Sequence, residues 1–319
     1  MVARGPLKIV FLGTPEFAVP TFDALLASRH EIVAVVTQPD RPRGRGHRVS
    51  DAPIKARATT SGIAVLQPNR LSDPSFRTAA AALGADLGVV AAYGKILPEW
   101  LLELPSFGMI NVHASLLPRH RGAAPVHRAV MAGDVETGVT IMRVVKALDA
   151  GPMMAKATRA IGPDETSDIV ERDLAQLGAR LLVNVVDDVA AGKTAETPQD
   201  DGAATYAPRL TKEDGVVDWS RAAAAIHNQI RGLHPWPHAF SFLDGRRFIL
   251  IRSQVDVHDR SNAAPGTVVH ADSDRLILAT GNGLLRIVEI QPEGKRLLSA
   301  REFLAGHRIQ PGAQFSGAP

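Results

Sequence analysis

The chain has 319 residues, of which 45% are hydrophobic and 22% charged, a composition typical of globular proteins. This length suits two domains better than one. There is no cysteine, which excludes disulfides, thiolate nucleophiles and cysteine-ligated metal centres. The formal net charge of +3 is too small to indicate a nucleic-acid partner by itself.

No segment of the sequence has the pattern of a signal peptide or a membrane span. The first apolar run, from Leu7 to Leu12, is too short for a secretory signal and ends in a Gly-Thr-Pro turn. No run reaches the roughly 18 apolar residues that a spanning helix needs. We therefore expect a cytoplasmic protein with no membrane partner.

The first two-thirds of the chain alternate β-branched runs with helical patterns. The expected strands are 8–12, 31–37, 63–67, 86–91, 109–113 and 139–145, with a return strand ending at 160. Helices are expected up to Leu26, from the Asp73-Pro74 cap to Leu83, and from about Asp168 to Ala191. Nearly continuous apolar strands separated by helices predict a mostly parallel sheet that is covered on both faces.

The last third has a different pattern. The segment from Gly192 to Gly215 is polar and interrupted by proline and glycine, which is typical of a linker. Beyond it we expect a helix over 221–231 and short strands at 247–252, 266–269, 276–279 and 284–290. Asp244-Gly245 and Asn282-Gly283 predict hairpin turns, so this part should be a small β-rich barrel or sheet.

The turn after the first strand, Gly13 to Phe17, differs from a dinucleotide-binding loop. It lacks the GxGxxG spacing, and Pro15 and Glu16 would hinder the close approach of a pyrophosphate. A dinucleotide cofactor is therefore not expected. The carboxyl end of this strand should still face the crevice where such sheets bind ligands.

Asn111 and His113 form a polar pair at the end of an otherwise apolar strand. Residues two apart on a strand point to the same face. A polar pair in such a place is costly unless each group has a partner or a function. The strand pattern alone favours neither a purely structural role for these two side chains nor a role in a reaction.

The longer sequence around this pair resembles that of the folate-dependent formyltransferase family. The resemblance lies in NVHASLLPRHRGAAPVHRAV from Asn111, in Lys146 to Gly151, in Ala91 to Pro98 and in Phe11 to Phe17. It implies a Rossmann-like, mostly parallel α/β sheet that binds formyl-tetrahydrofolate over residues 1–206. It also implies an OB-like small β-barrel that binds tRNA over residues 207–319.

The resemblance also implies a reaction in which an amine attacks the formyl carbon of 10-formyltetrahydrofolate, with no metal. Asn111 and His113 would offer hydrogen-bond donors to the oxyanion of the tetrahedral intermediate. His113 would also move a proton from the amine to the folate nitrogen. Asp149 would pair with the imidazolium and could order a water in the relay. Taken alone, Asp149 would be a solvated turn residue.

By the same resemblance the folate lies along Ser115, Leu116, Leu117 and Pro118 and along Lys95, Ile96 and Leu97. Leucines with free backbone amides and carbonyls suit a flat pterin, which needs both contact area and hydrogen bonds at its edge. Some of these leucines are also expected to serve as core.

A basic segment between residues 41 and 48 indicates the amine that is acylated. Arg41, Arg43, Arg45, His47 and Arg48 lie there without any acid, and a proline and two glycines interrupt them, so an exposed loop is expected. The resemblance implies that Arg41, Arg43, Arg45 and Arg48 contact the acceptor stem of an initiator methionyl-tRNA. His47 and Arg48 stand where lysines are frequent in the family, so this sequence departs from the family pattern at these two positions.

The C-terminal part agrees with this partner, since residues 207–319 contain 14 basic and 11 acidic residues. The motif Leu233 to Pro237 also resembles the family's C-terminal domain. Oligomeric state leaves no mark in the sequence, and a monomer is expected. Three alternatives remain: a formyltransferase for a small amine such as an amino sugar nucleotide or glycinamide ribonucleotide, a formyl-tetrahydrofolate hydrolase, and a nucleic-acid-binding module without activity.

Overall fold

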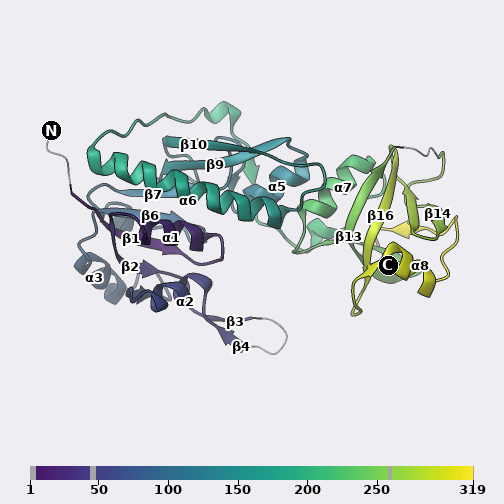
Figure 1. Cartoon of the computed structure of the whole chain (residues 1–319), viewed down its shortest axis with the longest axis horizontal. Helices are drawn as coiled ribbons and strands as arrows, with labels where there is room; N and C mark the ends of the chain where they lie inside the picture. The colour runs from purple at the N-terminus through teal and green to yellow at the C-terminus, as the bar shows by residue number, and fades with distance from the viewer. Residues whose placement is uncertain (1–4, 44–47, 258–260, 319) are drawn as a thin grey trace. The chain divides into compact units, whose positions relative to one another are not determined.

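The computed structural model describes residues 5–43, 48–257 and 261–318, and these form two compact units (Figure 1). The first unit comprises the described parts of Met1–Pro125, together with Thr137–Arg159 and Glu171–Ala207. The second comprises Val126–Glu136, Ala160–Val170 and the described parts of Pro208–Pro319. Two short segments that precede Pro208, Val126–Glu136 and Ala160–Val170, therefore belong to the C-terminal unit.

The first unit contains a seven-stranded sheet in the order β10-β9-β7-β6-β1-β2-β5. Its strands are β1 (Lys8–Gly13), β2 (Glu31–Val36), β5 (Val65–Leu66), β6 (Leu87–Ala91), β7 (Met109–His113), β9 (Glu136–Arg143) and β10 (Met153–Ala160). Five neighbouring strands of this sheet, β5, β2, β1, β6 and β7, pair in parallel, whereas β9 pairs antiparallel to β7. The expected Rossmann-like, mostly parallel sheet is confirmed.

The helices of the chain's first two-thirds are α1 (Ala18–Leu26), α2 (Pro53–Thr60), α3 (Pro74–Ala82), α4 (Glu99–Leu102), α5 (Pro125–Ala132) and α6 (Ser167–Ala191). α1, α3 and α6 agree with the predicted helices within one or two residues. α2 was not predicted, because only Ile54 and Ala58 of its residues are buried and the apolar periodicity is weak. β5 is shorter than the expected strand over 63–67, and β9 begins three residues earlier than expected.

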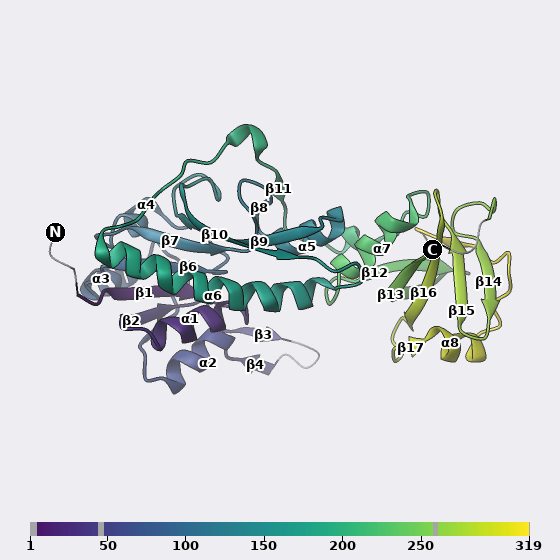
Figure 2. The same cartoon turned by 45° about the horizontal axis from the view of Figure 1, so that its top comes forward.

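The two faces of β7 have different neighbours. A Cβ added to Gly178 of α6 would lie only 2.7 Å from Val112 Cγ1, so α6 crosses β7 at close range on the face of Val112. Because side chains alternate along a strand, Asn111 and His113 point to the opposite face. Figure 2 shows the short strands β8 (Arg121–Gly122) and β11 (Tyr206–Ala207) on the side of the sheet away from α6. The polar pair therefore faces the side that these loops and short strands cover.

The second unit is built on an antiparallel sheet in the order β14-β15-β16-β13-β12-β18, with β17 beside β16. These strands are β12 (Ala239–Leu243), β13 (Arg246–Asp256), β14 (Val268–Asp272), β15 (Arg275–Ala279), β16 (Leu284–Pro292), β17 (Leu298–Ser299) and β18 (Phe315–Ser316). Backbone hydrogen bonds from Val268 to Ala313 and from Phe315 to Gly266 join the β14 end to the segment that becomes β18. The sheet thus closes on itself as the small β-barrel that was expected.

Two helices belong to this barrel, α7 (Ala223–Gly232) and α8 (Ala300–Gly306), of which only α7 was predicted. The predicted hairpin turns at Asp244-Gly245 and at Asn282-Gly283 join β12 to β13 and β15 to β16. In the described ranges, no helix is both long enough and apolar enough to cross a membrane.

Candidate active site

The strand β7 presents Asn111 and His113 next to each other on one face. Asn111 is half-buried and lies between Val90 of β6 and Met142 of β9, which pair with it on either side. Among the residues that the structure describes, none forms a hydrogen bond with the Asn111 carboxamide. His113 ends the strand and is only 5% exposed. The amide of Asn111 is therefore available to a ligand, while His113 sits deeper.

The two ring nitrogens of His113 have different partners. Nε2 lies 3.0 Å from the backbone oxygen of His120, and because a carbonyl only accepts, Nε2 carries a proton and donates it. Nδ1 faces the carboxylate of Asp149, with 3.7 Å between Nδ1 and Oδ2. This gap exceeds a direct hydrogen bond, so a bridging water or a small approach would complete the contact. The arrangement leaves Nδ1 as the nitrogen that exchanges a proton.

Asp149 reaches His113 because the loop between β9 and β10 folds back over the sheet. β9 ends at Arg143 opposite Ile110, whereas Thr140 lies opposite His113, so a loop that continued beyond the sheet edge would lead away from His113. The nitrogen of Arg143 instead bonds the oxygen of Pro152 and closes the loop tightly. A Cβ on Gly151 would lie 1.9 Å from the Arg143 oxygen, so only glycine fits there.

The carboxylate of Asp149 is held by a backbone donor from another loop. The Gly122 nitrogen donates to Asp149 Oδ2 at 2.8 Å, the same oxygen that faces His113. Asp149 itself has a φ of 47°, a left-handed conformation that costs free energy for a residue with a side chain, although aspartate adopts it more often than most. A carboxylate held in a strained turn beside a histidine is the kind of arrangement found at functional sites.

The segment after β7 is held mainly by its own hydrogen bonds. Ser115 is fully buried, and its hydroxyl donates to the Arg119 oxygen at 2.6 Å. Thr140 on β9 donates to the Ser115 oxygen and accepts from the Leu117 nitrogen. Leu117 is 1% exposed, whereas Leu116 and Pro118 are half-buried. Of the four residues expected along the folate, only Leu116 and Pro118 thus have side chains that a ligand can contact.

The second expected lining, Lys95 to Leu97, follows β6, which is the parallel neighbour of β7. Because the carboxyl ends of parallel strands meet at one edge, this loop and the one after His113 leave the sheet at the same edge. Ile96 is 88% exposed, and the Lys95 ammonium donates to the backbone oxygen of Asn69 at 3.2 Å. Tyr93 anchors the loop in the core, where burial raises its pKa to about 12.

The described parts of the basic segment are two short strands, β3 (Arg41–Arg43) and β4 (Arg48–Ser50), which pair antiparallel and are called the hairpin below. Arg41 and Arg43 lie on β3 and Arg48 on β4, whereas Arg45 and His47 lie outside the described residues. The Lys55 ammonium bridges the carboxylates of Asp40 and Asp51, which flank the hairpin on either side. One cation therefore ties both ends of the hairpin to α2.

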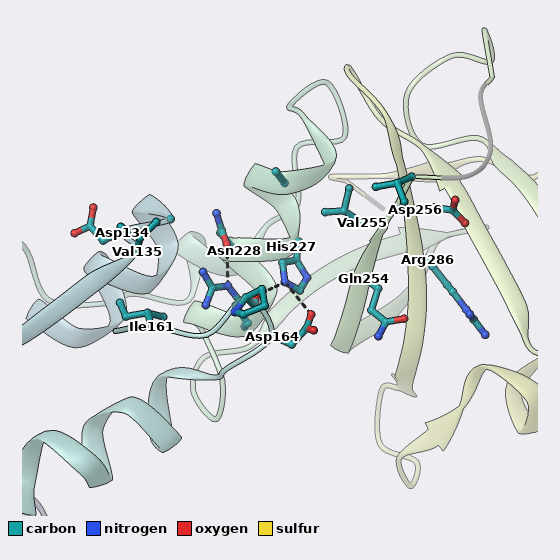
Figure 3. Close-up of a pocket in the computed structure, with 15 residues that line it drawn as sticks. Asp134, Val135, Ile161, Asp164, His227, Asn228, Gln254, Val255, Asp256 and Arg286 are labelled. Atoms are coloured by element: carbon teal, nitrogen blue, oxygen red, sulfur yellow. Dashed lines mark hydrogen bonds and ion pairs between the residues drawn. The ribbon is translucent and has the colours of Figure 1, made fainter. Parts of the chain in front are cut away.

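A separate hollow of about 690 Å³ lies in the second unit (Figure 3). The ring of His227 points to Asp164 there, with 3.5 Å between Nε2 and Oδ1. Gln254, Val255 and Arg286 line it from β13 and β16. None of the residues predicted from the sequence as catalytic or folate-binding lines this hollow. Within the described ranges, no three His, Asp or Glu side chains gather as a metal-binding group.

Sequence reasoning missed Gln199, whose side chain bonds the backbone on both sides of Ala150. Its Nε2 donates to the oxygens of Asp149 and Gly151, each at 2.8 Å. The residue lies in the polar segment that was interpreted as a linker, and no motif distinguishes it there. Only a spatial contact with the Asp149 turn identifies it.

Comparisons with known proteins find similar sequences over nearly the whole chain. A family model described as Formyl transferase matches residues 7–186, and one described as Formyl transferase, C-terminal domain, matches residues 209–308. A protein of Citrifermentans bemidjiense called methionyl-tRNA formyltransferase is 47% identical over 306 residues, which cover 96% of this chain and 95% of that protein.

Solved structures with low sequence identity share the fold. WlaRD, described as a sugar 3N-formyl transferase, has a TM-score of 0.68 at 15% identity and covers 91% of this chain and 99% of that one. HypX from Aquifex aeolicus has a TM-score of 0.64 at 16% identity over 95% of this chain. That match covers 48% of HypX, so this chain spans about half its length.

Proposed function

The chain belongs to the formyl transferase family, and from this membership we propose that it transfers the formyl group of 10-formyltetrahydrofolate to the amino group of methionyl initiator tRNA. The observation that supports this proposal most directly is the distance of 3.7 Å between His113 Nδ1 and the Asp149 carboxylate. It lies on the strand face that also bears Asn111. The acceptor is supported by the similarity to the Citrifermentans bemidjiense enzyme, which covers 96% of this chain.

The chemical step begins when the neutral amine attacks the formyl carbon, and it ends when the bond from that carbon to the folate nitrogen breaks. The oxygen of the tetrahedral intermediate carries a negative charge and needs donors. The Asn111 amide has two N–H groups, and no described residue engages them. His113 Nε2–H already binds the His120 oxygen. We therefore assign the oxyanion to Asn111 and proton transfer to His113.

Proton transfer runs through the Nδ1 side of His113. The amine loses a proton as the new carbon–nitrogen bond forms, and the folate nitrogen gains one as it leaves. Nδ1 takes up and returns this proton opposite a carboxylate, directly or through one water. The carboxylate of Asp149 stabilises the positive ring while the proton is held there. The steps use groups of the chain, of the two substrates and at most one water.

We assign residues 1–206 to the folate and the chemistry, and residues 207–319 to tRNA. In the first domain the half-buried Leu116, Pro118, Lys95 and Leu97 and the exposed Ile96 contact the pterin, while Ser115 and Leu117 shape the loop behind it. The arginines of the basic segment, at 41, 43, 45 and 48, contact the acceptor stem through phosphates or a guanine edge. This activity belongs to translation initiation, and a cytoplasmic location is part of the proposal for that reason; a monomer stays a prediction.

The proposal is tested by supplying 10-formyltetrahydrofolate with methionyl-tRNA, using the initiator and elongator forms in parallel. We expect formylation of the initiator form, with much less of the elongator form. Transfer only to an amino sugar nucleotide or to glycinamide ribonucleotide would favour a small-amine enzyme. Formate release without any acylated amine would favour a hydrolase. If neither a formylated amine nor formate forms, a nucleic-acid-binding module without activity remains.

A further inference from the structure

The polar segment after α6 is fastened to the first unit at two places. Thr197 forms an antiparallel bridge with Met153, with both N–H···O distances at 2.8 Å. Further along, Tyr206 and Ala207 pair in parallel with Arg121 and Gly122. Between these two attachments the segment passes the turn that carries Asp149. It is therefore a built part of the first unit, and the interpretation as a linker is wrong for residues 197–207.

Gln199 lies between the two attachments and uses its whole amide group. Both hydrogens of Nε2 are directed to backbone oxygens, those of Asp149 and Gly151. Its Oε1 accepts from Arg121 Nε at 3.0 Å. A glutamine oriented in this way holds both sides of a turn with one rigid group, because the two hydrogens and the oxygen lie in one plane.

Arg121 fixes the orientation of this glutamine. Its side chain is 5% exposed, and its Nη2 donates to Asp201 Oδ1 at 2.7 Å. The next residue, Gly122, donates its nitrogen to the Asp149 carboxylate. The same short strand thus holds the carboxylate of Asp149 directly and its backbone oxygen through Gln199.

Besides these bonds, the turn is closed by backbone hydrogen bonds from the Arg143 nitrogen to the Pro152 oxygen and from the Ala150 nitrogen to the Ala147 oxygen. The four residues before Asp149, from Val145 to Leu148, are all exposed, so burial contributes little to their position. Asp149 also has the unfavourable φ of 47°, which persists only where neighbouring groups enforce it. Hydrogen bonds from Gln199 and Gly122 supply that enforcement.

We infer that Gln199 is a positioning residue for the formyl transfer, which holds the turn of Asp149 so that its carboxylate faces His113. This inference rests on the proposed function and adds a residue to it. Gln199 bonds neither His113 nor the Asp149 carboxylate, and it holds the turn through the backbone oxygens of Asp149 and Gly151. Its removal should therefore lower turnover and leave substrate binding largely intact.

Two substitutions separate the contacts of Gln199. Gln199→Leu removes the hydrogen bonds to the Asp149 and Gly151 oxygens and the one from Arg121 Nε. Gln199→Glu keeps an acceptor for Arg121 but puts an oxygen against two carbonyl oxygens. Both should lower kcat by roughly 10- to 100-fold with little change in KM for the folate, because small displacements of a reacting group have effects of that size. Gln176→Glu, at an exposed position of α6, is the matched control and should behave as the wild-type protein.

A double-mutant cycle with Asp149→Asn decides whether Gln199 acts through Asp149. If it does, Gln199→Leu should change kcat less than about twofold in the Asp149→Asn background, because coupled residues are not additive. Additive losses would overturn the inference, as would an unchanged kcat for both Gln199 variants. A loss of kcat that merely parallels a loss of folded protein, followed by circular dichroism, would also overturn it.

Tryptic cleavage after Lys146 reports on the turn without any substrate. Lys146 is exposed, and a released turn should be cut faster in Gln199→Leu than in wild type or Gln176→Glu. Unchanged cleavage would contradict a positioning role. If the wild-type protein formylates no amine, the proposed function fails, and the role of Gln199 in that reaction fails with it. Faster cleavage of Gln199→Leu would even then establish that Gln199 holds the turn.

Discussion

His113 and Asn111 lie on the same strand face, yet their surroundings assign them different tasks. The carbonyl of His120 occupies one ring nitrogen of His113, while the Asn111 amide has no partner among the described residues. A free amide in a half-buried place can be directed at a developing charge, whereas an engaged N–H cannot. The two residues thus divide oxyanion binding and proton transfer between them.

Asn111→Ala tests this division. Because the substitution removes the proposed oxyanion donor and leaves the ring of His113 in place, we expect kcat to fall by about 10²–10³. The KM for the folate should change little, since the interaction forms mainly in the transition state. Steady-state kinetics with both substrates measures this, and a pure increase in KM would contradict the assignment.

Arg45→Ala tests the tRNA contact that is proposed for the basic segment. An arginine that contacts a phosphate or a guanine edge contributes about 1–3 kcal/mol, so we expect kcat/KM for initiator methionyl-tRNA to fall about tenfold or more. Folate binding, followed by fluorescence or calorimetry, should stay the same. Arg180→Ala, an exposed arginine on α6, is the control. Unchanged kinetics on the tRNA would refute the contact.

The start of α8 illustrates how one element is stabilised by charge. Ser299 accepts from the Glu302 nitrogen, and Glu302 accepts from the Ser299 nitrogen, which is a complete capping box. The Ser299 backbone donor, the Arg296 guanidinium and the Ser299 hydroxyl lower the pKa of Glu302 to about 2. The helix therefore begins where its first turn is best supplied with hydrogen-bond partners.

This shift predicts a pH dependence. The Glu302 pKa is near 4.5 in the unfolded chain and about 2 in the folded one. The stabilisation is thus present above about pH 4.5 and is lost as the pH falls towards 2. The melting temperature of Glu302→Gln should lie below that of wild type at pH 6, with a difference that shrinks on acidification. Glu293→Gln is the control; a pH-independent difference would contradict the prediction.

The two compact units do not follow a single cut in the chain. α5 belongs to the C-terminal unit, where Arg128 makes two hydrogen bonds to Asp214, at 2.8 and 3.1 Å. Ser167 at the start of α6 donates to the Gly232 oxygen at 2.7 Å. Contacts between residues 65 and 86 positions apart therefore complete this unit.

A fragment of residues 1–206 should consequently be less stable than the same residues in the full chain. It loses the partners of Arg128 and Ser167 and exposes Val126, Ala129 and Val130, which are buried in the full chain. We expect its thermal midpoint, measured by circular dichroism, to lie below the first transition of the full chain. Asp214→Ala in the full chain should lower that transition more modestly. Equal midpoints would refute the interdependence.

Much of the fold could be predicted because it is encoded locally. Apolar β-branched runs mark β1, β2, β6 and β7, and the Asp73-Pro74 pair marks the start of α3. The sequence motifs Asn111 to Pro118 and Leu148 to Gly151 indicated the family, which the comparisons confirm. α2 and β5 were missed or misjudged because short, half-exposed elements carry little periodicity.

The pattern of residue types in the chain was sufficient to establish a parallel sheet, a β-barrel and a family, because each of these depends on recurring residue types. It could not establish which nitrogen of His113 is free, how Asp149 returns to β7, or that Gln199 holds the turn. Those features depend on backbone oxygens of His120, Asp149 and Gly151, and a backbone oxygen is the same in every residue. Only the tertiary structure, by bringing distant segments within hydrogen-bond distance, decides what each of them binds.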